Sequence, residues 1–253
     1  MLAVSSEGDG RPDRGRYEGV MATQASVPRK SSLIPLTLVI TLVPVAAALN
    51  IVGGTINTTL KLPIFLDMIG TAVAAIVLGP WWGALVGVIT NVGGSFINGP
   101  IGIPFALANV AGALVWGYGI RSWGMGRSQL TFFILNCIVA LAVTAAAAPI
   151  VIFVFGGATG HSSDAITAAF AQAGQGLIES VFASNVIVSL ADKIIAGYVA
   201  LAIIAALPAH LTANLVLPPQ RGMKAALVAA GGITIGVALV LVYTLILAPT
   251  PAA

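Results

Sequence analysis

The stretch SLADKIIAG, residues 189–197, places a carboxylate beside an ammonium group inside an otherwise apolar run from about Glu179 to Leu207. This run is longer than the roughly 20 apolar residues that an α-helix needs to cross a bilayer. Charged side chains within such a helix are costly in lipid and usually face the interior of a helix bundle. The stretch therefore predicts a membrane-spanning helix in which Asp192 and Lys193 are structural charges.

The composition of the whole chain agrees with a lipid environment. Hydrophobic residues make up 58% of the 253 residues and charged residues 8%, against about 25% charged in an average soluble domain. Spans in lipid are helices or closed barrels, because their backbone groups must be satisfied internally. The apolar runs are continuous rather than alternating, which favours an all-α bundle. The net charge of +3 is too small to suggest nucleic acid as a partner.

Seven apolar runs are predicted to be spans. Residues 1–30 are predicted to be a disordered tail, residues 31–210 to hold six spans, and residues 211–253 to form a loop and a seventh, C-terminal span. Lysine and arginine residues precede span one and lie between spans four and five and between spans six and seven, which predicts a cytoplasmic N-terminus. The spans are expected at about 33–50, 65–79, 81–97, 104–121, 130–155, 179–207 and 224–248, with a short surface helix within 164–178.

In this orientation the polar side chains of the spans gather in the outer half of the membrane. If the polar side chains were distributed at random over the spans, about half of them would lie in the inner leaflet. A polar cavity that opens outward and is capped by the first loop, residues 50–61, is the economical explanation. Alternatively, Asp67 and Glu179 cap the N-termini of their helices. The candidate substrate-binding residues are Asn50, Asn57, Lys61, Asp67, Asn91, Asn109, Glu179 and Asn185.

Asp192 lies on the same helical face as two other polar residues. Asn185, Ser189 and Asp192 are spaced i, i+4, i+7, so this face is expected to look into the bundle. Adjacent residues point about 100° apart on a helix, so Asp192 and Lys193 are predicted not to pair with each other. Lys193 is expected either to extend toward the cytoplasm along its flexible stem or to pair with a carboxylate on another helix.

No motif predicts an enzyme. The two histidines, His161 and His210, stand singly in predicted loops, and no metal-ligand spacing accompanies them. No Walker A sequence and no nucleophile motif of the G-x-S-x-G type occurs. We therefore expect no catalytic residues, no metal site and no cofactor.

Three parts of the sequence together resemble a transporter family. These are ALNIVGG (48–54) with LKLPIFLDMIGTAVAAIVLGPWWGALVGVITN (60–91), PFALANVAGALVWG (104–117), and the Asp192–Lys193 pair. They resemble the substrate-binding S component of energy-coupling factor (ECF) transporters, which are prokaryotic importers of vitamins and related micronutrients. The likeness covers about residues 33–207.

The resemblance implies a fold, a location and a set of partners. It implies six transmembrane helices in the cytoplasmic membrane, an inside N-terminus, and a ligand site near the outer face that the loop after span one closes. It also implies a transmembrane T component and two ATPase subunits, which bind the ATP. The seventh span is additional to this pattern.

The function expected from these observations is capture of a small vitamin-like molecule for import. Lys61 suits a carboxylate or phosphate of that molecule, whereas Asp67 and Glu179 suit an amine or hydroxyl groups. The alternative is a multi-span sensory module of the membrane without catalytic activity.

Overall fold

The structure is a computed structural model, and it describes residues 35–218 and 223–246. The predicted tail, residues 1–30, lies outside the described residues. All regular elements of the described part are helices, as the all-α prediction requires. They are α2 (Leu36–Leu60), α3 (Ile69–Val77), α4 (Pro80–Asn98), the 3-10 helix η1 (Pro100–Phe105), α5 (Ala106–Arg121), α6 (Gln129–Phe153), α7 (Asp164–Gln172), α8 (Leu177–Ala206), α9 (Ala209–Thr212) and α10 (Met223–Ile246).

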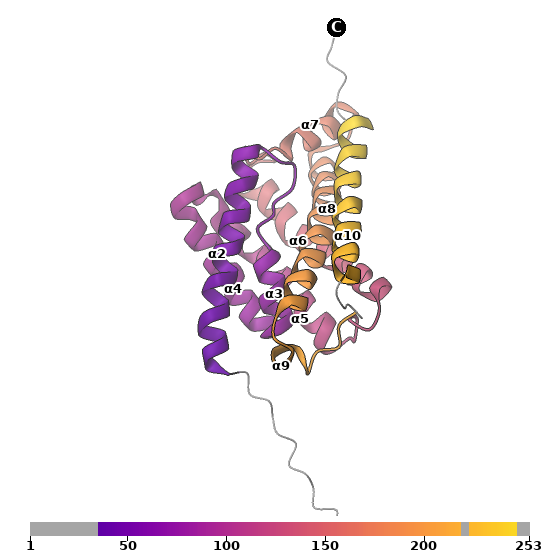
Figure 1. Ribbon diagram of the computed structural model, residues 1–253. Helices are drawn as coiled ribbons and strands as arrows, with labels where there is room; N and C mark the ends of the chain where they lie inside the picture. Colours follow the sequence, from indigo (N-terminus) through magenta and orange to yellow (C-terminus); the bar gives the residue numbers. More distant parts are fainter. Residues whose placement is uncertain (1–34, 219–222, 247–253) are drawn as a thin grey trace, which may run out of the picture. The chain divides into compact units, whose positions relative to one another are not determined.

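The long helices run alternately up and down in the bundle (Figure 1). Helix α2 begins at the lower end in this view, and α10 ends at the upper end. Helix α8 is central, since it packs against α3, α6, α7 and α10. Its middle section from Val188 to Tyr198 is buried apart from one half-buried residue. The run that carries Asp192 and Lys193 is therefore surrounded by protein on most sides.

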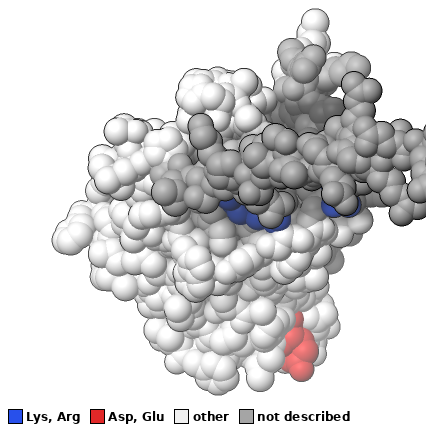
Figure 2. All heavy atoms as spheres, turned by 90° about the horizontal axis from the view of Figure 1, so that it is seen from below, with Lys and Arg blue, Asp and Glu red and all other residues white. Residues whose placement is uncertain are grey.

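The outer surface is apolar in the way that a lipid environment requires. Four helical segments of the described part are long and apolar enough to cross a membrane: Leu36–Leu60, Pro100–Arg121, Gln129–Phe153 and Leu177–Ala206. Large apolar side chains such as Phe96 and Phe153 are more than 80% exposed, which a water-soluble monomer rarely tolerates over a continuous surface. Figure 2 shows one end of the bundle, on which most of the described surface is white, with blue atoms at the edge of the grey ones and one red group farther away. These features indicate a membrane protein.

Helix α2 is longer than the sequence predicted, so the predicted first loop is wrong. Residues 50–60 form the last turns of α2, and the connection to α3 comprises only residues 61–68. Gly53 lies within the predicted loop, and its lack of a side chain makes room for packing. A Cβ atom on Gly53 would collide with the backbone carbonyl of Leu66. Gly53 therefore lets the returning chain lie directly against α2.

The connection from α2 to α3 enters the bundle instead of lying on its surface. The backbone amides of Phe65 and Leu66 bond to Asp192, which lies near the midpoint of α8. Helix α3 has 9 residues and rises only about 13 Å, so the predicted second span at 65–79 is helical in its second part alone. Irregular backbone at membrane depth is tolerated where it is buried in protein or lines a cavity. We name residues 61–68 the re-entrant segment.

Candidate functional site

A cavity of about 300 Å³ lies inside the bundle. Residues of α2, α4, α5, α6 and α8 line it, together with the re-entrant segment, η1 and the start of α7. Its walls combine amides with apolar groups such as Met68, Phe105 and Val143. Six of the eight predicted binding residues line this one cavity: Asn50, Asn57, Asp67, Asn91, Asn109 and Asn185.

The other two predicted residues lie elsewhere. Lys61 is exposed and borders a separate depression, which it shares with Thr58 and residues 160–162. Glu179 is exposed in the first turn of α8 and does not line the cavity. Its position suits the alternative expectation for this residue, since a carboxylate is favourable near a helix N-terminus.

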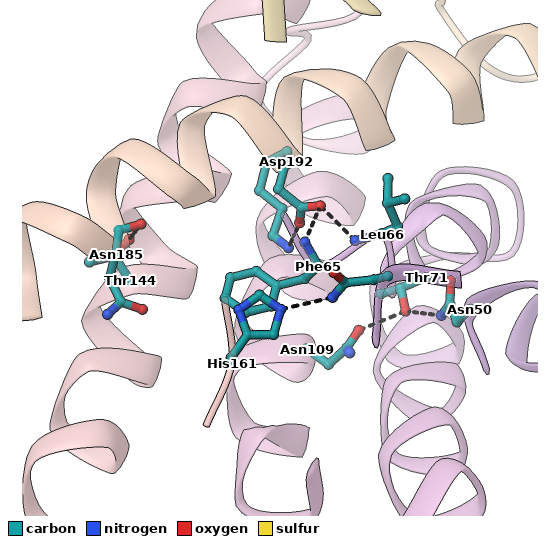
Figure 3. Close-up of polar contacts among 11 residues, drawn as sticks. Asn50, Phe65, Leu66, Thr71, Asn109, Thr144, His161, Asn185 and Asp192 are labelled. Carbon is teal, nitrogen blue, oxygen red and sulfur yellow. Dashed lines mark hydrogen bonds and ion pairs between the residues drawn. The ribbon is translucent and has the colours of Figure 1, made fainter. Parts of the chain in front are cut away.

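A hydrogen-bonded network joins four helices at one wall of the cavity (Figure 3). The side-chain amide of Asn50 donates to Thr71 Oγ1 at 2.8 Å and to Thr90 Oγ1 at 3.0 Å, and its oxygen accepts the amide proton of Gly70. Thr71 in turn donates to Asn109 Oδ1 at 2.8 Å. Asn50 is fully buried and its hydrogen bonds connect α2 with α3 and α4. This network holds Asn109 in a single orientation.

The network and local bonds decide which polar atoms remain for a ligand. Asn109 uses its oxygen on Thr71, so its NH2 group is available as a donor. Asn91 and Asn185 donate to the carbonyls of Gly87 and Val181, both at 2.9 Å, so their oxygens are available as acceptors. The cavity therefore offers both donors and acceptors from fixed positions on three helices.

Two further buried groups at the cavity have unsatisfied atoms. Ser189 Oγ and Asn57 Oδ1 have no hydrogen-bond partner within the described part of the chain, although Ser189 is 1% and Asn57 5% exposed. Buried polar atoms are nearly always paired in folded proteins, and exceptions need a specific explanation. Both residues line the cavity, so a bound molecule or water is the natural partner of each.

Asp192 and Lys193 form an ion pair, so the prediction that they do not pair is wrong. Lys193 Nζ contacts Asp192 Oδ2. The second carboxylate oxygen, Oδ1, accepts the amide protons of Phe65 at 3.1 Å and Leu66 at 2.8 Å (Figure 3). The helix does direct the two Cβ atoms apart, but the four-carbon stem of lysine is long enough to fold back.

The paired charges anchor the re-entrant segment to α8. The Asp192 carboxylate accepts two backbone amide protons that a nonhelical chain leaves without partners. The Lys193 ammonium group compensates the charge of this carboxylate. It also lies 5.8 Å from the centre of the Phe65 ring. Asp192 and Lys193 are 0% and 1% exposed. This arrangement answers why a carboxylate and an ammonium group stand side by side in the middle of an apolar helix.

His161 connects the loop before α7 to the re-entrant segment. Its ring stacks on Phe65 with 4.7 Å between centroids, and Nε2 lies 2.9 Å from the side-chain amide nitrogen of Asn57. Its Nδ1 accepts the backbone amide proton of Ser163 at 3.1 Å. All three partners line the same cavity as His161. The histidine thus closes the cavity between α2 and the loop that follows α6.

The tautomer of His161 determines which end of the Asn57 amide faces it. Because Nδ1 is an acceptor, a neutral imidazole carries its proton on Nε2. That proton requires an acceptor, so the Asn57 amide must present its oxygen to Nε2 and turn its NH2 group away. In either orientation one polar atom of the buried Asn57 side chain has no described protein partner.

The closure by His161 is expected to weaken in acid. His161 lies in the loop between α6 and α7, and burial lowers its pKa below 6.5, although Asp164 and Asp192 oppose this effect. The folded protein therefore favours the neutral ring, and this stability is present above pH 6.5 and is lost as the pH falls through the lowered pKa. We expect the melting temperature of the native protein to fall between pH 7.5 and 5. In the variant His161→Phe, which keeps the ring stack but cannot be protonated, the fall over the same pH range should be smaller. An equal fall in both proteins would contradict this role.

Some cavity residues were not predicted from the sequence. His161 and Asp164 line the cavity, but His161 was predicted only to be a single histidine in a loop. The usable signal was position, since a histidine in a glycine-rich loop, GGATGHSS (156–163), lies at the same end of the bundle as the other polar residues. Asp164 accepts the backbone amide protons of Thr159 at 2.8 Å and Gly160 at 2.7 Å and so shapes this loop.

Comparison of the chain with protein-family models, with curated proteins and with solved structures gave no match. The sequence patterns and the geometry of the cavity are therefore the basis for a functional proposal.

Proposed function

We propose that this protein is the substrate-capture subunit of an ECF-type importer for a vitamin or related micronutrient. The observation that carries the proposal is the cavity of about 300 Å³ inside an apolar helix bundle, lined by buried polar atoms that lack described protein partners. Cavities of roughly 300–1,000 Å³ with apolar walls and a few fixed polar groups are typical of small-molecule sites.

The proposal extends to the arrangement in the membrane. We place the chain in a prokaryotic cytoplasmic membrane with a cytoplasmic N-terminus, six spans and an additional seventh span that corresponds to α10. The distribution of lysine and arginine supports this orientation. The alternating directions of the helices agree with it (Figure 1), and so does the sequence resemblance to S components.

Two structural features support ligand capture in particular. The re-entrant segment closes one side of the cavity and is tied to α8 through Asp192. The loop that carries His161 closes another side through one hydrogen-bond contact and one ring stack. Such small contacts separate at modest cost, so this loop is suited to admit and retain a ligand.

Transport then requires partners. We propose a T component and two ATPase subunits, with ATP bound by those subunits. The role of this chain is to bind the ligand, and the partners supply the energy of import.

Purification from native membranes tests this function. We expect the tagged full-length chain to retain a small molecule and to co-purify with ATPase subunits and a T component. Reconstituted alone in liposomes, it is expected to bind the molecule but not to accumulate it with ATP. Co-purification with a signalling kinase in place of ATPases would favour the sensory alternative, and ATP-driven uptake by the chain alone would contradict the proposal.

A further inference from the structure

Three carboxylates and one lysine of the described residues lie around the cavity. Asp67, Asp164 and Asp192 lie at or directly behind its wall, and Lys193 lies beside Asp192. Burial lowers the pKa of the His161 ring, which disfavours a positive charge on it. A carboxylate that is removed from water is costly unless it is protonated or has a partner.

Two of the three carboxylates are already satisfied. Asp192 accepts two backbone amide protons and the Lys193 ammonium group. Asp164 accepts the amide protons of Thr159 and Gly160 and contacts the Thr159 hydroxyl group. Neither carboxylate therefore needs a further partner.

Asp67 differs from both of them. It is half-buried and lines the cavity, and no other described residue donates a hydrogen bond to its carboxylate. It lies within electrostatic reach of Lys193 and Asp192, but Lys193 is already bonded to Asp192. Among the three carboxylates, Asp67 is therefore the one that keeps its oxygens free of bonds from other described residues, and a cationic group of a ligand would bind its ionised form.

We infer that Asp67 is the subsite for a positively charged group of the ligand, such as an amidinium, guanidinium or protonated amine on a small ring. This inference rests on the proposed capture of a small molecule and names its chemical class. Ser189 and Asn57 are buried, line the same cavity and keep unpartnered polar atoms, so the rest of such a ligand finds hydrogen-bond partners. Among the described residues, Ser189 Oγ and the side-chain oxygens of Asn91 and Asn185 are the free acceptors of the cavity, and they suit a planar cation with N–H donors.

Lys61 does not alter the expected preference. Its side chain is exposed and borders the separate depression, outside the cavity lining. A charge in water is screened and contributes little to selection inside the cavity.

Three probes of nearly equal size and shape test the charge preference: benzamidine, benzamide and benzoate. Binding to the purified full-length protein is measured by calorimetric titration in detergent, after exchange of any retained molecule. We expect benzamidine to bind at least 10-fold more tightly than benzamide, and benzoate to bind most weakly, because hydrogen bonds between charged groups are the stronger kind.

Two variants assign the preference to one residue. Asp67→Asn keeps the shape of the side chain and is expected to remove the advantage of benzamidine over benzamide. Glu179→Gln removes an equal charge from the exposed start of α8 and should leave that advantage unchanged. Thermal melts of the same samples verify that both variants are folded.

The outcomes separate this inference from the proposed function. Equal binding of benzamidine and benzamide, no binding of benzamidine at 10 mM, or an unchanged preference in Asp67→Asn would overturn the inference. A retained native molecule without a cationic group, identified by mass spectrometry, would overturn it as well. None of these binding results depends on ATPase subunits. If ATPase subunits are absent from the purified complex, the proposed importer function is contradicted, but the charge preference of the cavity is not.

Discussion

Replacing Asp192 by leucine is expected to destabilise the folded protein by about 3–5 kcal/mol, since removal of one partner strands the other charge of a buried pair. The substitution leaves the Lys193 ammonium group, which is 1% exposed, without its carboxylate. It also removes the acceptor of two backbone amides in the re-entrant segment. Thermal unfolding of both proteins in detergent measures the loss of stability.

A double variant separates the stranded charge from the lost backbone bonds. Asp192→Leu with Lys193→Met removes both charges, so it should be more stable than Asp192→Leu alone, although less stable than the native protein. Lys61→Met removes an exposed lysine and serves as the control with no expected effect. If Asp192→Leu melts like the native protein, the anchoring role of this ion pair is wrong.

Replacing Asn109 by leucine is expected to weaken ligand binding by roughly 3- to 150-fold, the range for losing one hydrogen bond to a neutral or charged group. Thr71 holds the Asn109 oxygen, so the NH2 group is the part that is free for a ligand. Leucine keeps a similar volume and removes that donor. The measurement is calorimetric titration with the molecule that stays bound through gentle purification.

Asn136 provides a matched control for this variant. It is fully buried, like Asn109, but its oxygen accepts the indole proton of Trp116 at 2.8 Å and it does not line the cavity. Asn136→Leu should lower the melting temperature and leave affinity unchanged. Equal loss of affinity in both variants would show that general loosening of the bundle, and not a contact of Asn109, explains the effect.

The sequence was most informative where a single helix carries the signal. The predicted runs 81–97, 104–121, 130–155 and 179–207 correspond closely to α4, α5, α6 and α8, because continuous apolar runs define helices in lipid without knowledge of neighbours. The predicted cluster of polar residues likewise places six of eight side chains around one cavity. This grouping was predicted from span order and orientation alone.

The errors arose where a distant segment determines the local structure. Residues 50–60 were predicted to belong to a loop, yet they lie inside α2, where the absence of a side chain at Gly53 admits the backbone of Leu66. Asp192 and Lys193 pair because the amides of Phe65 and Leu66, about 127 positions away in the chain, hold the carboxylate. No periodicity in the sequence of α8 encodes that approach.

The sequence by itself therefore determined the helical class, the apolar surface and the grouping of the polar residues, because each follows from the transfer of local side chains between water and lipid. Only the tertiary structure decided which polar atoms remain unpartnered. Asn50 is committed to Thr71 and Thr90, Asp192 to the re-entrant segment, and Asp67 to no other described residue. The physical reason is that a hydrogen bond or ion pair depends on distance and direction between residues far apart in the chain, and packing of the helices sets both.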